Sequence, residues 1–243
     1  MPQRPKDTMR AAILHAAASE FADHGLAQVP LMRIAEQAGT SIGNLYKYFA
    51  NKEALFQAAV PAAVAPQLAR LLRQRIEALH GVKEVRTLPA GHPYHRQSEA
   101  LLLFTLQHRH ALRFWLDHSE GTPLAGFPER LVTRLTQLSS AYARRTYPQI
   151  DLDASRRRAL QRIYRAFLGS LSAILREEQS PAALQRATGH LTEYHLAGLR
   201  AFFLAAQSQG QERGHSKKTT KTKAKTKTKT KAKTKAKAKE SAC

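Results

Sequence analysis

Cysteine is almost absent from this sequence: Cys243 is the one cysteine among 243 residues. An internal disulfide therefore cannot form, which fits a reducing compartment. No apolar run approaches the roughly 20 residues that a membrane-spanning helix needs. Glu20 and Asp23 interrupt the apolar N-terminal stretch and argue against a signal peptide. These absences predict a cytoplasmic protein that has no membrane partner.

The residue sets of common enzyme and metal sites are also missing. His108 and His110 are two positions apart and His190 and His195 are five apart, so neither pair has the i, i+4 spacing of helical metal ligands. The Asp-His-Ser run at 117–119 has the residue types of a catalytic triad, but chain neighbours cannot generally adopt its geometry. No glycine-rich phosphate loop is present. We expect no enzyme activity, no metal and no cofactor.

Acidic residues are few, with 18 Asp and Glu against 39 Lys and Arg, which gives a formal net charge of +21. About half of this excess lies in residues 217–243, which hold 12 lysines and one glutamate, whereas residues 1–60 have six basic and five acidic residues. A strong positive charge indicates a polyanionic partner, nucleic acid first and a membrane surface second.

The lysine-rich tail alternates Lys with Thr or Ala and contains no aromatic or large aliphatic residue. It cannot bury a core, so we predict a disordered tail over 210–243. Its composition resembles the basic tails of linker-histone-like proteins. A tail that only solubilises the protein is the alternative.

The rest of the chain shows helical spacing of apolar residues and no convincing strand, which predicts an all-α fold of about nine helices. Pro61 and Pro66 should kink or split the helix that contains them. The same spacing divides the chain into a small helical domain at 1–52, a larger helical domain at 53–209, and the tail at 210–243.

Residues 31–53, LMRIAEQAGTSIGNLYKYFANKE, contain two short apolar stripes joined by a corner. Gly39 supplies the backbone freedom for a sharp turn, and Thr40 and Ser41 offer hydroxyls that can cap the second helix. This arrangement predicts a helix-turn-helix, whose second helix enters a major groove. Pattern alone also fits a small helical hairpin with core aromatics.

The segment GTSIGNLYKYFANKEALF resembles the pattern of the TetR/AcrR family of bacterial repressors, Ala-Gly-x-Ser-x-Gly-x-Leu-Tyr-x-His-Phe-x-x-Lys-Glu-x-Leu. The resemblance covers roughly residues 9–56. It departs at Tyr48, where the family has histidine, and at Pro30-Leu31, where a Thr/Ser pair usually opens the second helix of the domain. Since Leu31 cannot cap, that helix should rely on Pro30 in its first turn.

The polar outward face and the family resemblance predict residues that contact bases or phosphates. These DNA-binding candidates are Arg33, Thr40, Ser41, Ile42, Gly43, Asn44, Tyr46, Lys47, Tyr48 and Lys52.

The family resemblance further implies that residues 1–52 are a DNA-binding domain and that residues 53–209 are an effector-binding and dimerisation domain. It implies an effector pocket enclosed by the C-terminal helices, and a dimer interface formed by the last two helices of each subunit. The pocket candidates are Phe104, His108, Phe114, Trp115, Tyr142 and Tyr164. The interface candidates are Phe167, Leu171, Leu175, Leu191, Leu199 and Phe202. Each of these apolar residues could instead belong to the core of the monomer.

We therefore expect a homodimeric transcriptional regulator that binds a palindromic operator in double-stranded DNA. Repression relieved by an unidentified small-molecule effector is the expected action. The alternative is a nucleoid-associated architectural protein, which would act mainly through its lysine-rich tail.

Overall fold

The structure, a computed structural model, describes residues 6–240, with side chains described for 6–209 and 211. Regular structure in this part of the chain is entirely helical, which confirms the all-α prediction. Ten α-helices and two short 3-10 helices follow one another: α1 (Lys6–Gln28), α2 (Leu31–Gln37), α3 (Ile42–Leu45), α4 (Lys52–Ala59), η1 (Ala62–Val64), α5 (Ala65–Glu77), η2 (Val85–Thr87), α6 (Pro93–Gln107), α7 (Arg109–Asp117), α8 (Phe127–Thr146), α9 (Ala154–Glu177) and α10 (Pro181–Glu240).

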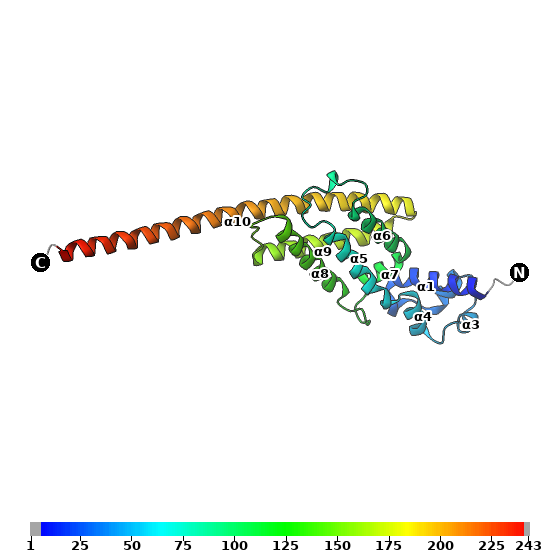
Figure 1. The fold of residues 1–243 in the computed structure, drawn as a ribbon. Coiled ribbons are helices and arrows are strands. Elements are labelled where there is room, and N and C mark those ends of the chain that lie inside the picture. The colour runs from blue at the N-terminus through cyan, green and yellow to red at the C-terminus, as the bar shows by residue number, and fades with distance from the viewer. Residues whose placement is uncertain (1–5, 241–243) are drawn as a thin grey trace.

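Helices α1 to α4 form a small head at one end of the molecule (Figure 1). In α1 the buried face includes Ile13, Ala17 and Phe21, as the helical spacing predicts. Gly25 has a φ of 77°, outside the helical region, and interrupts the helix three residues before its end. This left-handed conformation favours glycine, because a side chain there would be strained.

The helix-turn-helix consists of α2, a corner and α3. Gly39 has a φ of 69° at the corner, and the Ser41 side chain caps α3 by accepting a hydrogen bond from the Asn44 backbone N–H at 3.2 Å. Pro30 is the N-cap of α2 rather than a first-turn residue, so that prediction was wrong by one position. Regular α3 ends at Leu45, and Tyr46 to Tyr48 continue as turns.

Asn51 caps α4, and the helix ends before Pro61, where a short 3-10 turn leads into α5. This break confirms the predicted split. The segment Lys52–Glu77 is long and apolar enough to cross a membrane by length and composition, which the sequence analysis did not anticipate. Core helices of soluble proteins pass the same test, and here Leu55, Phe56 and Leu68 are buried against other helices.

The body consists of α5 to α9 and the first part of α10 (Figure 1). Helices α6 and α7 are separated at His108, and the Asp153 side chain caps α9. One apolar cluster joins the head to α7 and α9, and a second fills the space between α8, α9 and α10. Because the first cluster crosses residue 52, the domain limits at 1–52, 53–209 and 210–243 stay predictions.

Helix α10 does not end where the tail was predicted to begin, at residue 210, but continues to Glu240 and projects away from the body (Figure 1). Alanine and lysine are good helix formers, and neither Gly nor Pro occurs after Gly214, so nothing in the sequence interrupts the helical backbone. No other element lies alongside the projecting part to hold it (Figure 1). Disorder of this tail in solution therefore stays a prediction, and Cys243 lies outside the described residues.

Aromatic rings join the head to the body. Phe56 of α4 lies 5.5 Å from Phe21 of α1 and 4.9 Å from Phe114 of α7, measured between ring centroids. Beside them, the buried Arg113 of α7 donates a hydrogen bond to Asp23 of α1 at 2.5 Å. Apolar contact and an ion pair therefore fix α7 against α1 and α4.

This joint predicts that head and body unfold together. Truncating Phe56, which is 3% exposed, should lower the free energy of unfolding by about 3–5 kcal/mol because a cavity remains between three helices. Chemical denaturation of Phe56→Ala followed by far-UV circular dichroism measures the loss. Leu103→Ala is the control, since Leu103 is 59% exposed, and it should change the stability little. Two separate transitions, of which only one shifts, would contradict a shared core.

Candidate DNA-binding surface and ligand cavity

Helix α3 presents a short polar surface whose backbone is held by its own side chains. Asn44 donates a hydrogen bond from Nδ2 to the Thr40 hydroxyl at 2.8 Å, while its backbone N–H is bound by Ser41. These two bonds place the side chains of Thr40, Ser41 and Asn44 at the start of α3. Hydroxyl and amide groups at a helix N-terminus can bind phosphate or base edges.

The other residues in and after α3 that were predicted to contact DNA differ in how far their side chains are exposed to solvent. Gly43, Tyr46 and Lys47 are exposed, with Tyr46 at 51%, whereas Ile42 is half-buried. Tyr48 is also half-buried and packs against the core of the head. The exposed members can reach a groove without rearrangement, and Tyr48 has only part of its ring free for a phosphate.

Arg33 and Lys52 have partners within the head. Arg33 forms an ion pair with Glu20 at 2.7 Å, and Glu20 is nearly buried. Lys52 donates a hydrogen bond to the Ala27 carbonyl at 3.3 Å, and partial burial lowers its pKa. Both cations tie neighbouring elements to α1, so a DNA contact from either would have to be made in addition to a structural bond.

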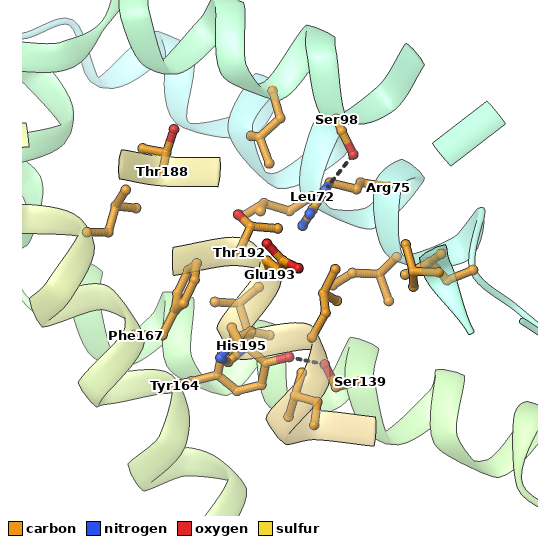
Figure 2. Close-up of a pocket in the computed structure, with 18 of the residues that line it drawn as sticks. Leu72, Arg75, Ser98, Ser139, Tyr164, Phe167, Thr188, Thr192, Glu193 and His195 are labelled. Carbon is orange, nitrogen blue, oxygen red and sulfur yellow. Dashed lines mark hydrogen bonds between the residues drawn. The ribbon is translucent and has the colours of Figure 1, made fainter. Parts of the chain in front are cut away.

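A cavity of about 780 Å³ lies in the body, walled mainly by leucine and phenylalanine side chains of α5 to α10 (Figure 2). This volume is within the usual range of small-molecule sites, about 300–1,000 Å³. Leu112 and Leu116 of α7 line it, whereas Arg113 and Phe114 of the same helix contact the head. Helix α7 therefore separates the cavity from the head by one layer.

Polar groups enter the cavity at a few points. Arg75 of α5 donates to the Ser98 hydroxyl at 2.9 Å and to the Tyr94 hydroxyl at 2.7 Å. On the opposite wall the hydroxyls of Tyr164 and Ser139 are hydrogen-bonded, and burial raises the pKa of Tyr164 to about 12 (Figure 2).

His195 of α10 stacks against Phe167 at 4.4 Å between ring centroids. Burial, with the charge of Arg75 as the second cause, lowers the pKa of His195 to about 4, so its imidazole is neutral at pH 7.

Two of the six pocket candidates, Tyr142 and Tyr164, line this cavity. Phe114 and Trp115 are fully buried and pack on Phe56 and Phe127, because the large rings of α7 point toward the head and α8. The other two candidates, Phe104 and His108, lie outside the lining and pack on each other.

The sequence analysis missed Arg75 and His195. A signal for Arg75 was present, because it interrupts the apolar stripe of Leu68, Leu72 and Leu79. An arginine on the apolar face of an amphipathic helix needs a polar partner or a ligand.

The interface candidates point mostly inward. Leu175 and Leu199 are buried in the monomer, Phe167 and Leu171 line the cavity, and Leu191 is half-buried. Phe202 is half-buried and packs on Phe203.

A different face of α9 and α10 is exposed and consists of small or apolar residues. Its members are Ala166, Gly169 and Ser170 of α9, with Tyr194, Ala197, Gly198, Ala201, Leu204 and Ala205 of α10.

Comparison with known proteins finds a family match in the head. Residues 13–59 match the family model of bacterial regulatory proteins, tetR family, so the head is similar to the N-terminal domain of these proteins. A TetR-family transcriptional regulator from Pectobacterium atrosepticum is similar at 21% identity, with a TM-score of 0.35, over 81% of this chain and 97% of that one. A TetR-family regulator from Streptomyces coelicolor A3 is similar at 20% identity, with a TM-score of 0.25, over 84% and 99%. No curated protein matches the chain.

Proposed function

We propose that this chain is a one-component transcriptional regulator of the TetR type, which binds a palindromic operator as a homodimer and is released by a small molecule. The observation that carries the proposal is the helix-turn-helix of residues 31–48, with an exposed polar α3, inside a segment that matches the tetR family. Repression follows from operator occupancy, since a bound dimer excludes other proteins from the same DNA.

In this proposal Ile42, Gly43, Asn44 and Lys47 face base edges. Thr40, Ser41, Tyr46, Tyr48 and Lys52 hold phosphates, with Arg33 beside them. Asn44 can bind adenine in a bidentate manner, and Lys47 can bind guanine. The bond from Asn44 to Thr40 has to be exchanged or shared when the amide meets a base.

Release works through the layer between the cavity and the head. A ligand that contacts Leu112 or Leu116 displaces α7, and α7 carries Arg113 and Phe114 against α1 and α4. In a dimer, a small rotation of each head changes the spacing of the two α3 helices, and half-site spacing is a geometric requirement of operator binding.

Dimerisation is proposed through the exposed face of α9 and α10. Tyr194 is 81% exposed on this face, which is unusual for an aromatic ring in a helix of a monomer. A Cβ added to Gly169 or Gly198 would meet nothing within 4 Å, so packing inside the monomer does not require glycine there. Small residues allow helices of two subunits to approach closely.

The architectural alternative has its support in the tail, with 12 lysines in residues 217–243. Genome-wide footprinting of the full-length and tail-deleted proteins separates the two functions. A regulator gives a few sharp palindromic sites with either protein. An architectural protein gives broad coverage that disappears when the tail is removed.

Base readout and phosphate binding are separable by mutation. Asn44→Ala should cost about 1–3 kcal/mol at one base pair of each half-site and relax the preference there. Tyr46→Phe should weaken binding to all sequences by a similar factor, because phosphates carry no sequence information. Binding to an operator library, with each base pair varied in turn, measures both effects. A change of preferred sequence in Tyr46→Phe would refute its assignment to phosphate.

The dimer face is tested by adding charge at an exposed small residue. Ala201→Arg should give folded monomers, because an arginine cannot fit between closely packed helices. Ala182→Arg, exposed near the start of the same helix, is the matched control and should remain dimeric. Leu199→Glu should instead unfold the protein, since Leu199 is 8% exposed. Sedimentation equilibrium and circular dichroism measure the outcomes; a folded Ala201→Arg dimer would exclude this face.

The tail should add affinity that does not depend on sequence. Deleting 217–243, or replacing its 12 lysines by glutamine at constant length, should flatten the plot of log affinity against log salt. Affinity for random DNA should fall more than operator preference, and most strongly at low salt, because screening acts within about 8–10 Å at physiological ionic strength. Equal slopes for the wild type and both variants would mean that the tail does not contact DNA.

A further inference from the structure

Arg75 is a cation without an acidic partner inside an apolar cavity. Among the described residues no carboxylate forms an ion pair with it, and the two groups that it binds are the neutral hydroxyls of Ser98 and Tyr94. Arg75 is half-buried, and its Cζ atom also lies 5.0 Å from the centroid of the Tyr94 ring in a cation–π contact. Neither the hydroxyls nor the ring supplies the negative charge with which an arginine in an apolar surrounding is usually paired. A guanidinium has five N–H donors, so two hydrogen bonds leave others free. Figure 2 shows the Arg75 guanidinium directed into the cavity.

His195 of α10 is a second polar side chain of the cavity whose hydrogen-bonding capacity is not satisfied. Its Nε2 atom is buried and has no hydrogen-bond partner in the described part of the chain. The charge of Arg75 acts on both His195 and Tyr164, so the three side chains lie within electrostatic reach of one another. A neutral imidazole can donate from Nε2, and a ligand oxygen between Arg75 and His195 would satisfy both groups.

Two of the three acidic residues that line the cavity are paired with arginines. Arg86 pairs with Glu193 of α10, and Arg200 of α10 pairs with Glu84 beside η2. These two pairs tie the loop that contains η2 to α10 across the edge of the cavity. The third, Glu99 of α6, is exposed, so solvent screens the repulsion that it exerts on an anion.

We propose that the cavity binds an amphipathic organic anion, with a carboxylate or similar oxyanion between Arg75 and His195 and an apolar remainder among the surrounding leucines. A planar guanidinium fork matches a carboxylate and makes two parallel hydrogen bonds to it. Around this head group the walls offer leucine and phenylalanine side chains of α5 to α10. Only the role of this anion as the effector rests on the proposed function.

The position of Arg75 also connects the ligand to the head. Helix α5 follows α4 through the short η1, and Arg75 lies on the same helix as Leu68 and Leu71, which belong to the cluster shared with the head. An anion that draws Arg75 away from Ser98 and Tyr94 acts on α5 directly. Ligand binding therefore has a second route to α4, besides the route through α7.

Two fluorescent probes with one skeleton test the anion site in the full-length protein: 8-anilino-1-naphthalenesulfonate, which is anionic, and N-phenyl-1-naphthylamine, which is neutral. Arg75→Met should weaken binding of the anionic probe roughly 10- to 100-fold, as expected for loss of a charge-assisted hydrogen-bond pair. Binding of the neutral probe should change less than twofold. Arg73→Met is the matched control, because Arg73 is exposed on the same helix and its loss removes the same charge.

The outcomes are distinct. Equal affinity of Arg75→Met and wild type for the anionic probe would overturn the proposal, as would an equal effect of Arg73→Met. Loss of both probes in Arg75→Met would assign Arg75 to structural support and also overturn it. Operator binding is measured separately: a chain that fails to bind any operator but shows the Arg75-dependent anion affinity loses the regulator proposal and keeps the anion site.

Discussion

The packing of Phe56 between Phe21 and Phe114 is the constraint on which the rest of the molecule depends. The three rings, from α4, α1 and α7, belong to one hydrophobic core, so the head does not have a core separate from that of the body. Closely packed interiors respond to a shift by moving whole elements rather than by deforming continuously. The ion pair between Arg113 of α7 and Asp23 of α1 also constrains how these two helices are oriented relative to each other. In the proposed function, a displacement of α7 is therefore passed to the head and is not absorbed at the joint.

Local features of the chain were predictable because they depend on neighbouring residues. The Ser41 cap, the corner at Gly39 and the break at Pro61 all follow from the chemistry of a few adjacent positions. The orientation of long helices was harder to predict. Helices α9 and α10 have apolar residues on more than one face, and spacing alone does not say which face meets the monomer's own core. The interface candidates accordingly included Leu175 and Leu199, which are buried, and omitted Tyr194 and Ala201, which are exposed.

The cavity shows that sequence spacing is equally limited in predicting which polar side chains come together. Tyr142 and Tyr164 were predicted as aromatic lining, but the chemistry of the site lies with Arg75 and His195, which are 120 positions apart in the chain. No local sequence pattern connects Arg75 with His195. They come together because α5 and α10 pack around the same cavity. In the proposed anion site, a ligand that enters this space supplies the acidic partner that Arg75 lacks.

The projecting end of α10 leaves the body on the side away from the head (Figure 1). In the proposed function, a duplex held by α3 lies at one end of the molecule, and the backbone of residues 217–239 leaves from the other. A tail in this extended form would meet a second stretch of DNA rather than the flanks of the operator. One molecule would then connect two duplexes, and its local concentration at an operator would depend on how often distant parts of one chromosome meet.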